Sequence, residues 1–207
     1  MPINQFGQEI GPDLEAWSPP PPPPYSVIRG RTVRLEPLDP ARHVPQLAGA
    51  LVGSDAAMWT YTPYGPFTDT DDVVRAVTGM LEPDDWQAYA VVRDEDAVGF
   101  ACYLRIKPGA GTIEVGSIGF SPSLQRTTAA TETLYLLIRN AFDLGYRRCE
   151  WKCDAFNRTS RSAAERLNIR GRKIVAIGRV REYECILIKR NELRYALCST
   201  NAINTAR

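Results

Sequence analysis

The feature that most constrains the fold is a strand–helix–strand pattern over residues 112–153. Residues 112–120 alternate in polarity as a strand does, and residues 129–144 carry apolar side chains at helical spacing. Gly145 follows, where a helix commonly ends, and residues 147–153 alternate again. Two strands joined through a helix in this way pair in parallel. The pattern therefore predicts a parallel pair within the sheet.

The remaining segments predict antiparallel strands and further helices around this unit. Upstream strands are expected at 32–38, 86–92 and 97–106. One helix is expected from Pro40 to Leu51, and another begins at Thr68 or Asp69 with a buried side made of Val73, Val74, Val77 and Leu81. Downstream, the expected elements are a helix capped by Asn157 and ending at Leu167, and a hairpin of 174–177 with 183–188. The predicted class is mixed α/β, with a central mixed sheet and helices on both faces.

The chain divides into three parts at the level of composition. Residues 1–30 form an extension that holds six consecutive prolines, Pro19 to Pro24, which favour a stiff polyproline II segment. This run is either a spacer that lays residues 1–17 against the domain or a docking ligand for an SH3-type module. The domain itself is expected over residues 31–190, followed by a tail at 191–207 without an amphipathic pattern.

Charge and cysteine content exclude several classes of partner. The 207 residues include 25 Lys+Arg and 24 Asp+Glu, a formal net charge of +1, which predicts no general attraction to nucleic acid or membrane. No apolar run reaches the roughly 20 residues of a membrane helix, and the N-terminus does not resemble a secretory signal. Five cysteines without CxxC spacing favour reduced thiols in a cytoplasmic protein.

Several enzyme classes are disfavoured by missing residues. His43 is the only histidine and has no nucleophile motif near it, which argues against hydrolases of the Ser-His-Asp or Cys-His type. Cys149 and Cys153 alternate with Trp151 along an expected strand, which favours core packing over a zinc site. Walker-type and dinucleotide-binding glycine motifs are absent. No metal is expected.

The segment Leu124–Glu132 lies between a strand and a helix and is rich in small residues. A helix N-terminus offers unpaired N–H groups and a partial positive charge, and small side chains let a ligand approach the backbone. With Arg126 and the threonine hydroxyls, this segment suits a pyrophosphate. Taken alone, it also fits an ordinary threonine-rich helix cap.

In its motifs and their order the chain resembles the GNAT superfamily of N-acetyltransferases, in particular the branch of the ribosomal-protein alanine acetyltransferases. The resemblance covers about residues 31–168. It is carried by Ile113-Glu114-Val115-Gly116-Ser117-Ile118-Gly119-Phe120-Ser121-Pro122, Leu124-Gln125-Arg126-Thr127-Thr128-Ala129-Ala130-Thr131-Glu132, Gly145-Tyr146-Arg147-Arg148, Glu150-Trp151-Lys152-Cys153-Asp154, Asn157-Arg158-Thr159-Ser160 and Ala163-Ala164-Glu165-Arg166-Leu167.

The resemblance implies an acyl-coenzyme A cleft between two splayed strands, those that hold Val115 and Trp151. In the family's pyrophosphate loop, Gln125 and Ala130 match the pattern while Thr128 replaces a glycine. Backbone N–H groups near Ser117 or Ile118 would polarise the thioester carbonyl. The expected cofactor-binding residues are Ser117, Ile118, Gln125, Arg126, Thr127, Thr128, Ala129, Ala130 and Asn157.

Two catalytic residues are expected from the same resemblance. Glu114 matches a carboxylate that often accepts the amine's proton; the alternative is an exposed strand residue paired with Arg or Lys. Many relatives place a tyrosine on the last helix to protonate the leaving thiolate, and Ala164 takes that position here. Ser160 is the hydroxyl left near that end, with helix capping as its alternative role. In the aromatic loop 58–67, Trp59, Tyr61 and Tyr64 are expected to line the acceptor pocket or to pack in the core.

The expected function is transfer of an acetyl group from acetyl-coenzyme A to a protein N-terminus or a small amine, by a monomer or homodimer. An α-amino group is favoured over lysine because its reference pKa is lower. The resemblance ends after Leu167, where the chain diverges naturally or follows a shifted reading of its gene. The alternative function is therefore an inactive acetyl-coenzyme A-binding module with a disrupted acceptor site. The basic segment 170–194 is a nucleic-acid patch or a solvated hairpin.

Overall fold

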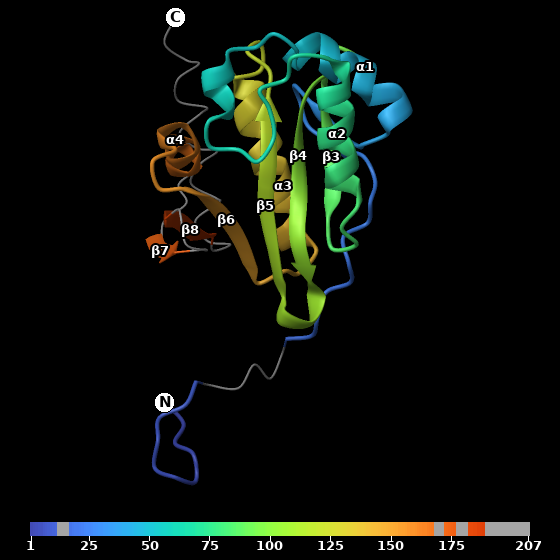
Figure 1. Cartoon of the computed structure of the whole chain (residues 1–207). Coiled ribbons are helices and arrows are strands. Elements are labelled where there is room, and N and C mark those ends of the chain that lie inside the picture. The colour runs from blue at the N-terminus through green and yellow to red at the C-terminus, as the bar shows by residue number, and fades with distance from the viewer. Residues whose placement is uncertain (12–16, 168–171, 177–181, 189–207) are drawn as a thin grey trace, which may run out of the picture.

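A single sheet organises the molecule. The computed structural model describes residues 1–11, 17–167, 172–176 and 182–188, and within them the strands follow the order β1-β2-β3-β4-β5-β6-β8-β7 (Figure 1). Only β5 and β6 pair in parallel, and the other neighbouring pairs are antiparallel. The strand bounds are β1 Ile28–Arg29, β2 Arg34–Pro37, β3 Gln87–Arg93, β4 Asp96–Lys107, β5 Thr112–Phe120, β6 Arg148–Asp154, β7 Arg172–Ala176 and β8 Glu182–Ile188.

The helices begin at capping residues that the sequence supplies. Asp39 Oδ1 accepts from the Ala41 N–H at 3.0 Å, and Asp69 Oδ1 accepts from the Asp72 N–H at 2.9 Å. None of the described helices is both long enough and apolar enough to span a membrane. The helix bounds are α1 Pro40–Leu51, α2 Thr70–Leu81, α3 Thr128–Asp143 and α4 Arg158–Arg166, with 3₁₀ turns η1 Ala56–Trp59 and η2 Pro108–Ala110.

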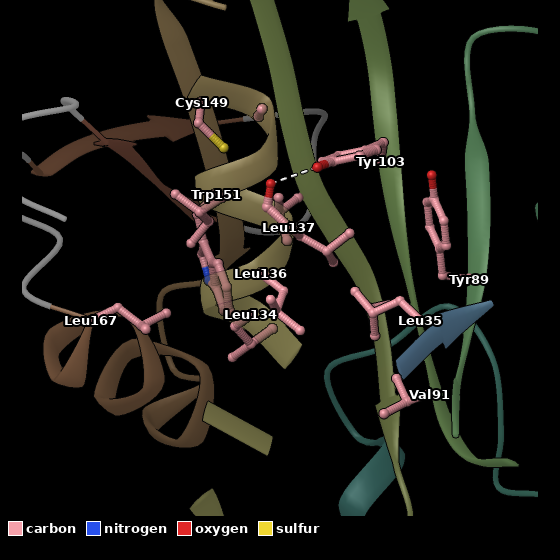
Figure 2. Packing of buried hydrophobic residues seen from close by; sticks show 14 of the residues in the cluster. Leu35, Tyr89, Val91, Tyr103, Leu134, Leu136, Leu137, Cys149, Trp151 and Leu167 are labelled. Atoms are coloured by element: carbon pink, nitrogen blue, oxygen red, sulfur yellow. Dashed lines mark hydrogen bonds between the residues drawn. The ribbon is translucent and has the colours of Figure 1, made fainter. Parts of the chain in front are cut away.

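Two hydrophobic clusters cover the two faces of the sheet. On one face α1 and α2 pack on alternate residues of β3 and β4, among them Phe100 and Cys102. On the other face α3 and α4 pack on β5 and β6 (Figure 2). There the Tyr103 hydroxyl donates to the Leu137 carbonyl at 2.5 Å, which ties β4 to α3 across the core. The predicted mixed sheet with helices on both faces is confirmed.

The central crossover forms as the sequence predicts. β5 and β6 lie side by side in one sheet, with α3 between them in the chain. The predicted hairpin also pairs, since β7 and β8 are antiparallel neighbours and β8 lies next to β6. The turn of this hairpin and the tail 191–207 lie outside the described residues, as does much of the basic segment 170–194.

The predicted buried side of α2 is partly wrong. Val73 and Val77 are buried, but Val74 and Leu81 are 42% and 38% exposed, and Met80 is buried in their place. The buried positions follow an i, i+4, i+7 stripe, so the contact with the sheet is narrower than the run of valines suggested.

The proline run lies against the domain itself and is not a free spacer. Pro20 and Pro23 are buried while the prolines between them are exposed, which is the three-residue period of polyproline II. The Pro23 carbonyl accepts from Gln87 Nε2 at 2.7 Å. Ahead of the run, Trp17 packs over Gly111 and under the guanidinium of Arg147. We call residues 17–27 the strap.

The strap continues directly into the sheet. The Tyr25 hydroxyl donates to the Ala88 carbonyl at 2.5 Å and accepts from the Leu38 N–H at 3.2 Å. β1, which begins three residues before Arg31, then pairs with β2. The folded unit therefore includes part of the segment that composition assigns to an extension.

Candidate functional site

The two central strands part after a short parallel pairing. β5 and β6 pair only where Thr112–Glu114 face Arg148–Glu150. Beyond this point β6 leans away from β5 towards α4 and pairs with β8 on its other side (Figure 1). Backbone N–H and C=O groups in the later part of β5 thus have β4 as their strand neighbour and no β6 partner. A second extended molecule can pair there as an added strand would.

A β-bulge lies in β5 at this point. The register with β4 shifts between Phe100 and Cys102, and Ser117 has a φ of 46°, in the left-handed region. Such a conformation in a non-glycine residue is strained and re-aims the neighbouring backbone groups. The bulge contains Ser117 and Ile118, the two residues whose N–H groups are expected to polarise the thioester carbonyl.

Glu114 is buried in an ion-pair network at the same junction. Its side chain is 3% exposed, and its carboxylate accepts from Arg105 Nε at 2.8 Å and from Lys152 Nζ at 2.5 Å. Lys152 also donates to Glu150 at 2.7 Å. The alternative role expected for Glu114 was an exposed strand residue paired with Arg or Lys. Glu114 is paired in this way but is not exposed, because the neighbouring strands bring both cations over its carboxylate.

Arg105 reaches Glu114 through a second bulge. The β4–β5 register shifts again between Leu104 and Lys107, and Arg105 has a φ of 48°. Sequence reasoning did not identify Arg105 or Lys152 as site residues. The alternation of Glu150 with Lys152 on the strand expected to pair with that of Glu114 is a signal that would have found Lys152, whereas no sequence signal predicts the bulge at Arg105.

The loop between β5 and α3 is closed by its own side chains. Gln125 Nε2 donates to the Phe120 carbonyl at 3.0 Å. Thr127 caps α3: its hydroxyl donates to the Leu124 carbonyl at 2.6 Å and accepts from the Ala130 N–H at 3.1 Å. Gln125 and Thr127 therefore shape the loop, and the N–H of Ala130 is already used.

The backbone at the start of α3 keeps free donors. Within the described part of the chain, the N–H groups of residues 126–129 have no hydrogen-bond acceptor, and Arg126 has a φ of 60° that turns the loop into the helix. The side chains of Arg126 and Thr128 are exposed, whereas Ala129 and Ala130 are only 5% and 8% exposed. The two alanines thus pack in the core and do not line the loop surface. Four adjacent donors at a helix N-terminus beside an arginine suit an anion of the pyrophosphate type.

The last helix follows β6, the other strand of the parted pair. Asn157 caps α4, with its Oδ1 accepting from the Ser160 N–H at 3.0 Å. The Ser160 hydroxyl accepts from the Trp151 indole N–H at 2.9 Å, so the capping role considered for Ser160 is wrong. Ala164 is fully buried in the core beneath α4. Phe156, which sequence reasoning did not single out, is 73% exposed just before the cap.

The aromatic loop divides into core and site residues. Trp59 is 4% exposed and its indole donates to Ser54 Oγ at 3.1 Å, which makes it a core residue. Tyr61 is 40% exposed. Tyr64 is half-buried, and burial raises the pKa of its phenol above the ordinary value, against a smaller lowering by the nearby Ser117 side chain. Of the three expected acceptor-side residues, Tyr64 is the one that the structure brings to β5.

The described residues hold no cluster of three or more His, Cys, Asp or Glu side chains able to bind a metal ion. The parted strands, the bulge and the helix N-terminus together suit an extended ligand that carries a phosphate group.

Comparison with known proteins shows the family of the chain. A family model described as an acetyltransferase (GNAT) domain matches residues 32–170, and the chain belongs to this family of N-acetyltransferases. A probable GNAT-family acetyltransferase from Chromobacterium violaceum is 36% identical, with a TM-score of 0.80 over 90% of this chain and 98% of that one. A GCN5-related N-acetyltransferase from Brucella melitensis is 32% identical, with a TM-score of 0.80 over 91% of this chain and 90% of that one.

More distant structures share the fold. RimL, a ribosomal L7/L12 α-N-protein acetyltransferase solved in complex with coenzyme A, is 18% identical, with a TM-score of 0.65 over 79% of this chain and 98% of that one. Among curated protein sequences, no significant match was found.

Proposed function

We propose that this enzyme transfers an acetyl group from acetyl-coenzyme A to an α-amino group. The observation that carries the proposal is the divergence of β5 from β6 immediately after Glu114, with the α3 N-terminus at its open end. The pyrophosphate is assigned to the free N–H groups of residues 126–129 and to Arg126. The pantetheine arm is assigned to the unpaired edge of β5, which offers strand-type hydrogen bonds.

The acceptor amine is assigned to the Glu114 side of the sheet. Glu114 pairs across the ladder with Leu104, which packs with α1 and α2, so the carboxylate lies on the face opposite α3. An amine must lose a proton during transfer, and Glu114 is a buried carboxylate on β5 at the point where the strands part. An α-amino group, with a reference pKa of about 7.7–8.0, is more often neutral near pH 7 than a lysine at about 10.4.

The acceptor side is supported by the continued sheet. Because β8 pairs with β6 over six residues, the divergent segment after Leu167 still adds strands where the family's acceptor pocket lies. This pairing favours an active enzyme over an inactive acetyl-coenzyme A-binding module. We also propose a cytoplasmic location, on the cysteine usage alone.

The test is a thiol-release assay with acetyl-coenzyme A and matched peptides. One peptide has a free N-terminus and no lysine, and its partner has a blocked N-terminus and one lysine. We expect release only with the first. Release only with the lysine peptide would reject the α-amino assignment, and coenzyme A binding without release across a wide amine panel would support the inactive module.

A further inference from the structure

We infer that Tyr64 is a further catalytic residue, donating a hydrogen bond to the thioester carbonyl oxygen beside the β5 bulge. The inference rests on the proposed acetyl-coenzyme A site and adds to it a side-chain donor from the loop between α1 and α2. The role is distinct from that of Ser160 on α4, whose hydroxyl accepts from Trp151 and keeps its own proton to donate.

Packing places the Tyr64 ring over the bulge. Gly119 has no side chain, and a Cβ built there would lie 2.3 Å from the Phe100 ring, so that ring lies directly on β5. The Tyr64 ring meets Phe100 edge-on, with centroids 5.3 Å apart. The phenol interacts with the Ser117 side chain, which lowers its pKa by less than burial raises it. The phenol is thus held beside the strained residue of β5.

The loop that carries Tyr64 is held in place by the core. The Thr62 hydroxyl donates to the Tyr64 carbonyl at 2.6 Å, and the Trp59 ring lies so close to Gly65 that a Cβ there would meet it at 2.6 Å. Trp59 in turn packs edge-on against Phe67, with centroids 4.6 Å apart. A donor fixed in advance in this way loses little freedom during the reaction, which is what makes oxyanion donors effective.

The chemistry fits a donor that keeps its proton. The amine nitrogen attacks the carbonyl carbon, a C–N bond forms, and the carbonyl electron pair moves to oxygen. That pair then returns, the C–S bond breaks with its electrons on sulfur, and the amine proton passes to Glu114 or water. Tyr64 stabilises the negative oxygen between these events. Because burial raises the pKa of Tyr64, the phenol stays protonated through the neutral range.

The carbonyl and Glu114 have separate places along β5. Ser117 lies three residues beyond Glu114 on β5, at the bulge. The phenol and the carboxylate therefore flank the same stretch of β5, one suited to the oxygen and the other to the amine.

The experiment compares Tyr64→Phe with the wild type and with Tyr146→Phe. The control removes a hydroxyl from a buried tyrosine whose hydroxyl makes a 3.4 Å bond to the strap, at Pro21. For Tyr64→Phe we expect kcat to fall about 10²-fold with the KM for acetyl-coenzyme A unchanged. The ratio of the wild-type kcat to the Tyr64→Phe kcat should stay constant from pH 6 to 9. Ser117→Ala, which removes the hydroxyl beside the phenol but keeps the backbone, should show a smaller fall.

A binding readout tests the same contact without an acceptor. Acetyl-dethia-coenzyme A keeps the carbonyl and replaces the sulfur with a methylene. Tyr64→Phe should bind it about threefold to tenfold more weakly and bind coenzyme A unchanged. If Tyr64→Phe matches the wild type both in turnover and in affinity for acetyl-dethia-coenzyme A, the inference about Tyr64 is overturned and the proposed function is not. An equal loss of affinity for both ligands would show a packing role and also overturn it. A wild type that binds neither ligand would reject the proposed function as well.

Discussion

The carboxylate of Glu114 on β5 and the ammonium of Lys152 on β6 lie 2.5 Å apart. Glu114 pairs with Glu150 in the last backbone pair of the two strands, and Lys152 lies two residues after Glu150. A side-chain ion pair thus continues the contact between the strands where their backbone pairing stops. The same carboxylate is bonded to Arg105. Any acceptor amine that reaches Glu114 enters a network of fixed charges.

Glu114→Gln should lower turnover by roughly 10²–10⁴-fold with coenzyme A affinity nearly unchanged, because the amide cannot accept the amine's proton. The variant should also melt at a lower temperature, since two cations lose a buried partner. The measurements are steady-state kinetics, calorimetric titration of coenzyme A and a melting curve. Wild-type turnover would remove Glu114 from the mechanism.

Glu150→Gln is the matched control for this prediction. Glu150 shares Lys152 with Glu114 but lies on β6. Burial alone would raise the pKa of Glu150, but the bond to Lys152 and the nearby charges of Lys152, Arg148 and Arg105 together lower it. We expect turnover within a fewfold of the wild type. A loss equal to that of Glu114→Gln would mean that the whole network matters, and not one proton acceptor.

Thr128→Glu should weaken coenzyme A binding at least tenfold, because it sets a carboxylate against the donors meant for the pyrophosphate. Thr128 is the exposed first residue of α3, where an acidic side chain suits the helix dipole, so the melting temperature should not fall. Substituting Ala130 would be a poorer test, since its buried side chain would place a new carboxylate in the core.

The control is Thr70→Glu, the same change at the exposed first residue of α2. Titration calorimetry should give wild-type affinity for this variant. Wild-type affinity in Thr128→Glu too would show that the α3 N-terminus is only a helix cap.

Glu132→Gln should destabilise the protein at pH 7 and much less below pH 4. The Glu132 carboxylate accepts from the Arg31 and Thr32 N–H groups, both at 2.7 Å, and from the Thr32 hydroxyl. Burial alone would raise the pKa of Glu132, but these bonds outweigh it and lower the pKa. A lowered carboxyl pKa stabilises the fold above the unfolded pKa of about 4.3, and the gain is lost as pH falls through the folded pKa.

After discounting for its exposure, we expect the bonded carboxylate to contribute about 1 kcal/mol, or about 2–4 °C in melting temperature. Melting curves of both proteins at pH 7 and at pH 3.5 measure this. Glu82→Gln, at an exposed carboxylate that ends α2, should give no such difference. A gap between wild type and Glu132→Gln that widens in acid would contradict the assignment.

Deleting residues 1–11 should leave the melting temperature nearly unchanged, whereas deleting residues 1–24 should lower it. The first segment is bonded within itself, with Asn4 Oδ1 accepting from the Phe6 and Gln8 N–H groups. The longer deletion removes Trp17 and the buried prolines, worth about 2 kcal/mol of apolar burial or about 4–8 °C. Equal melting temperatures for the two deletions would mean that residues 17–24 of the strap do not stabilise the domain.

Much of this fold follows from local patterns in the sequence. Thr112–Phe120, α1 and the caps at Asp69 and Asn157 lie where alternation, helical spacing and capping chemistry predict them, because each depends on neighbours within a few residues. The strand–helix–strand pattern also predicted the parallel pairing, since the handedness and length of a crossover leave few other arrangements. The free N–H groups at the start of α3 lie in the small-residue segment that the sequence singled out, and their use by an anion stays a prediction.

The tertiary structure decided how the side chains of the site are used. The burial of Glu114, the positive φ of Arg105 and Ser117, and the contact of Tyr64 with β5 all join segments distant in sequence. The docking of Pro20 and Pro23 is of the same kind, because a polyproline helix has no internal hydrogen bonds and takes its partners from the surface it meets. Sequence periodicity reports which face of an element is apolar, whereas bulges and ion pairs depend on which strands become neighbours and where they part.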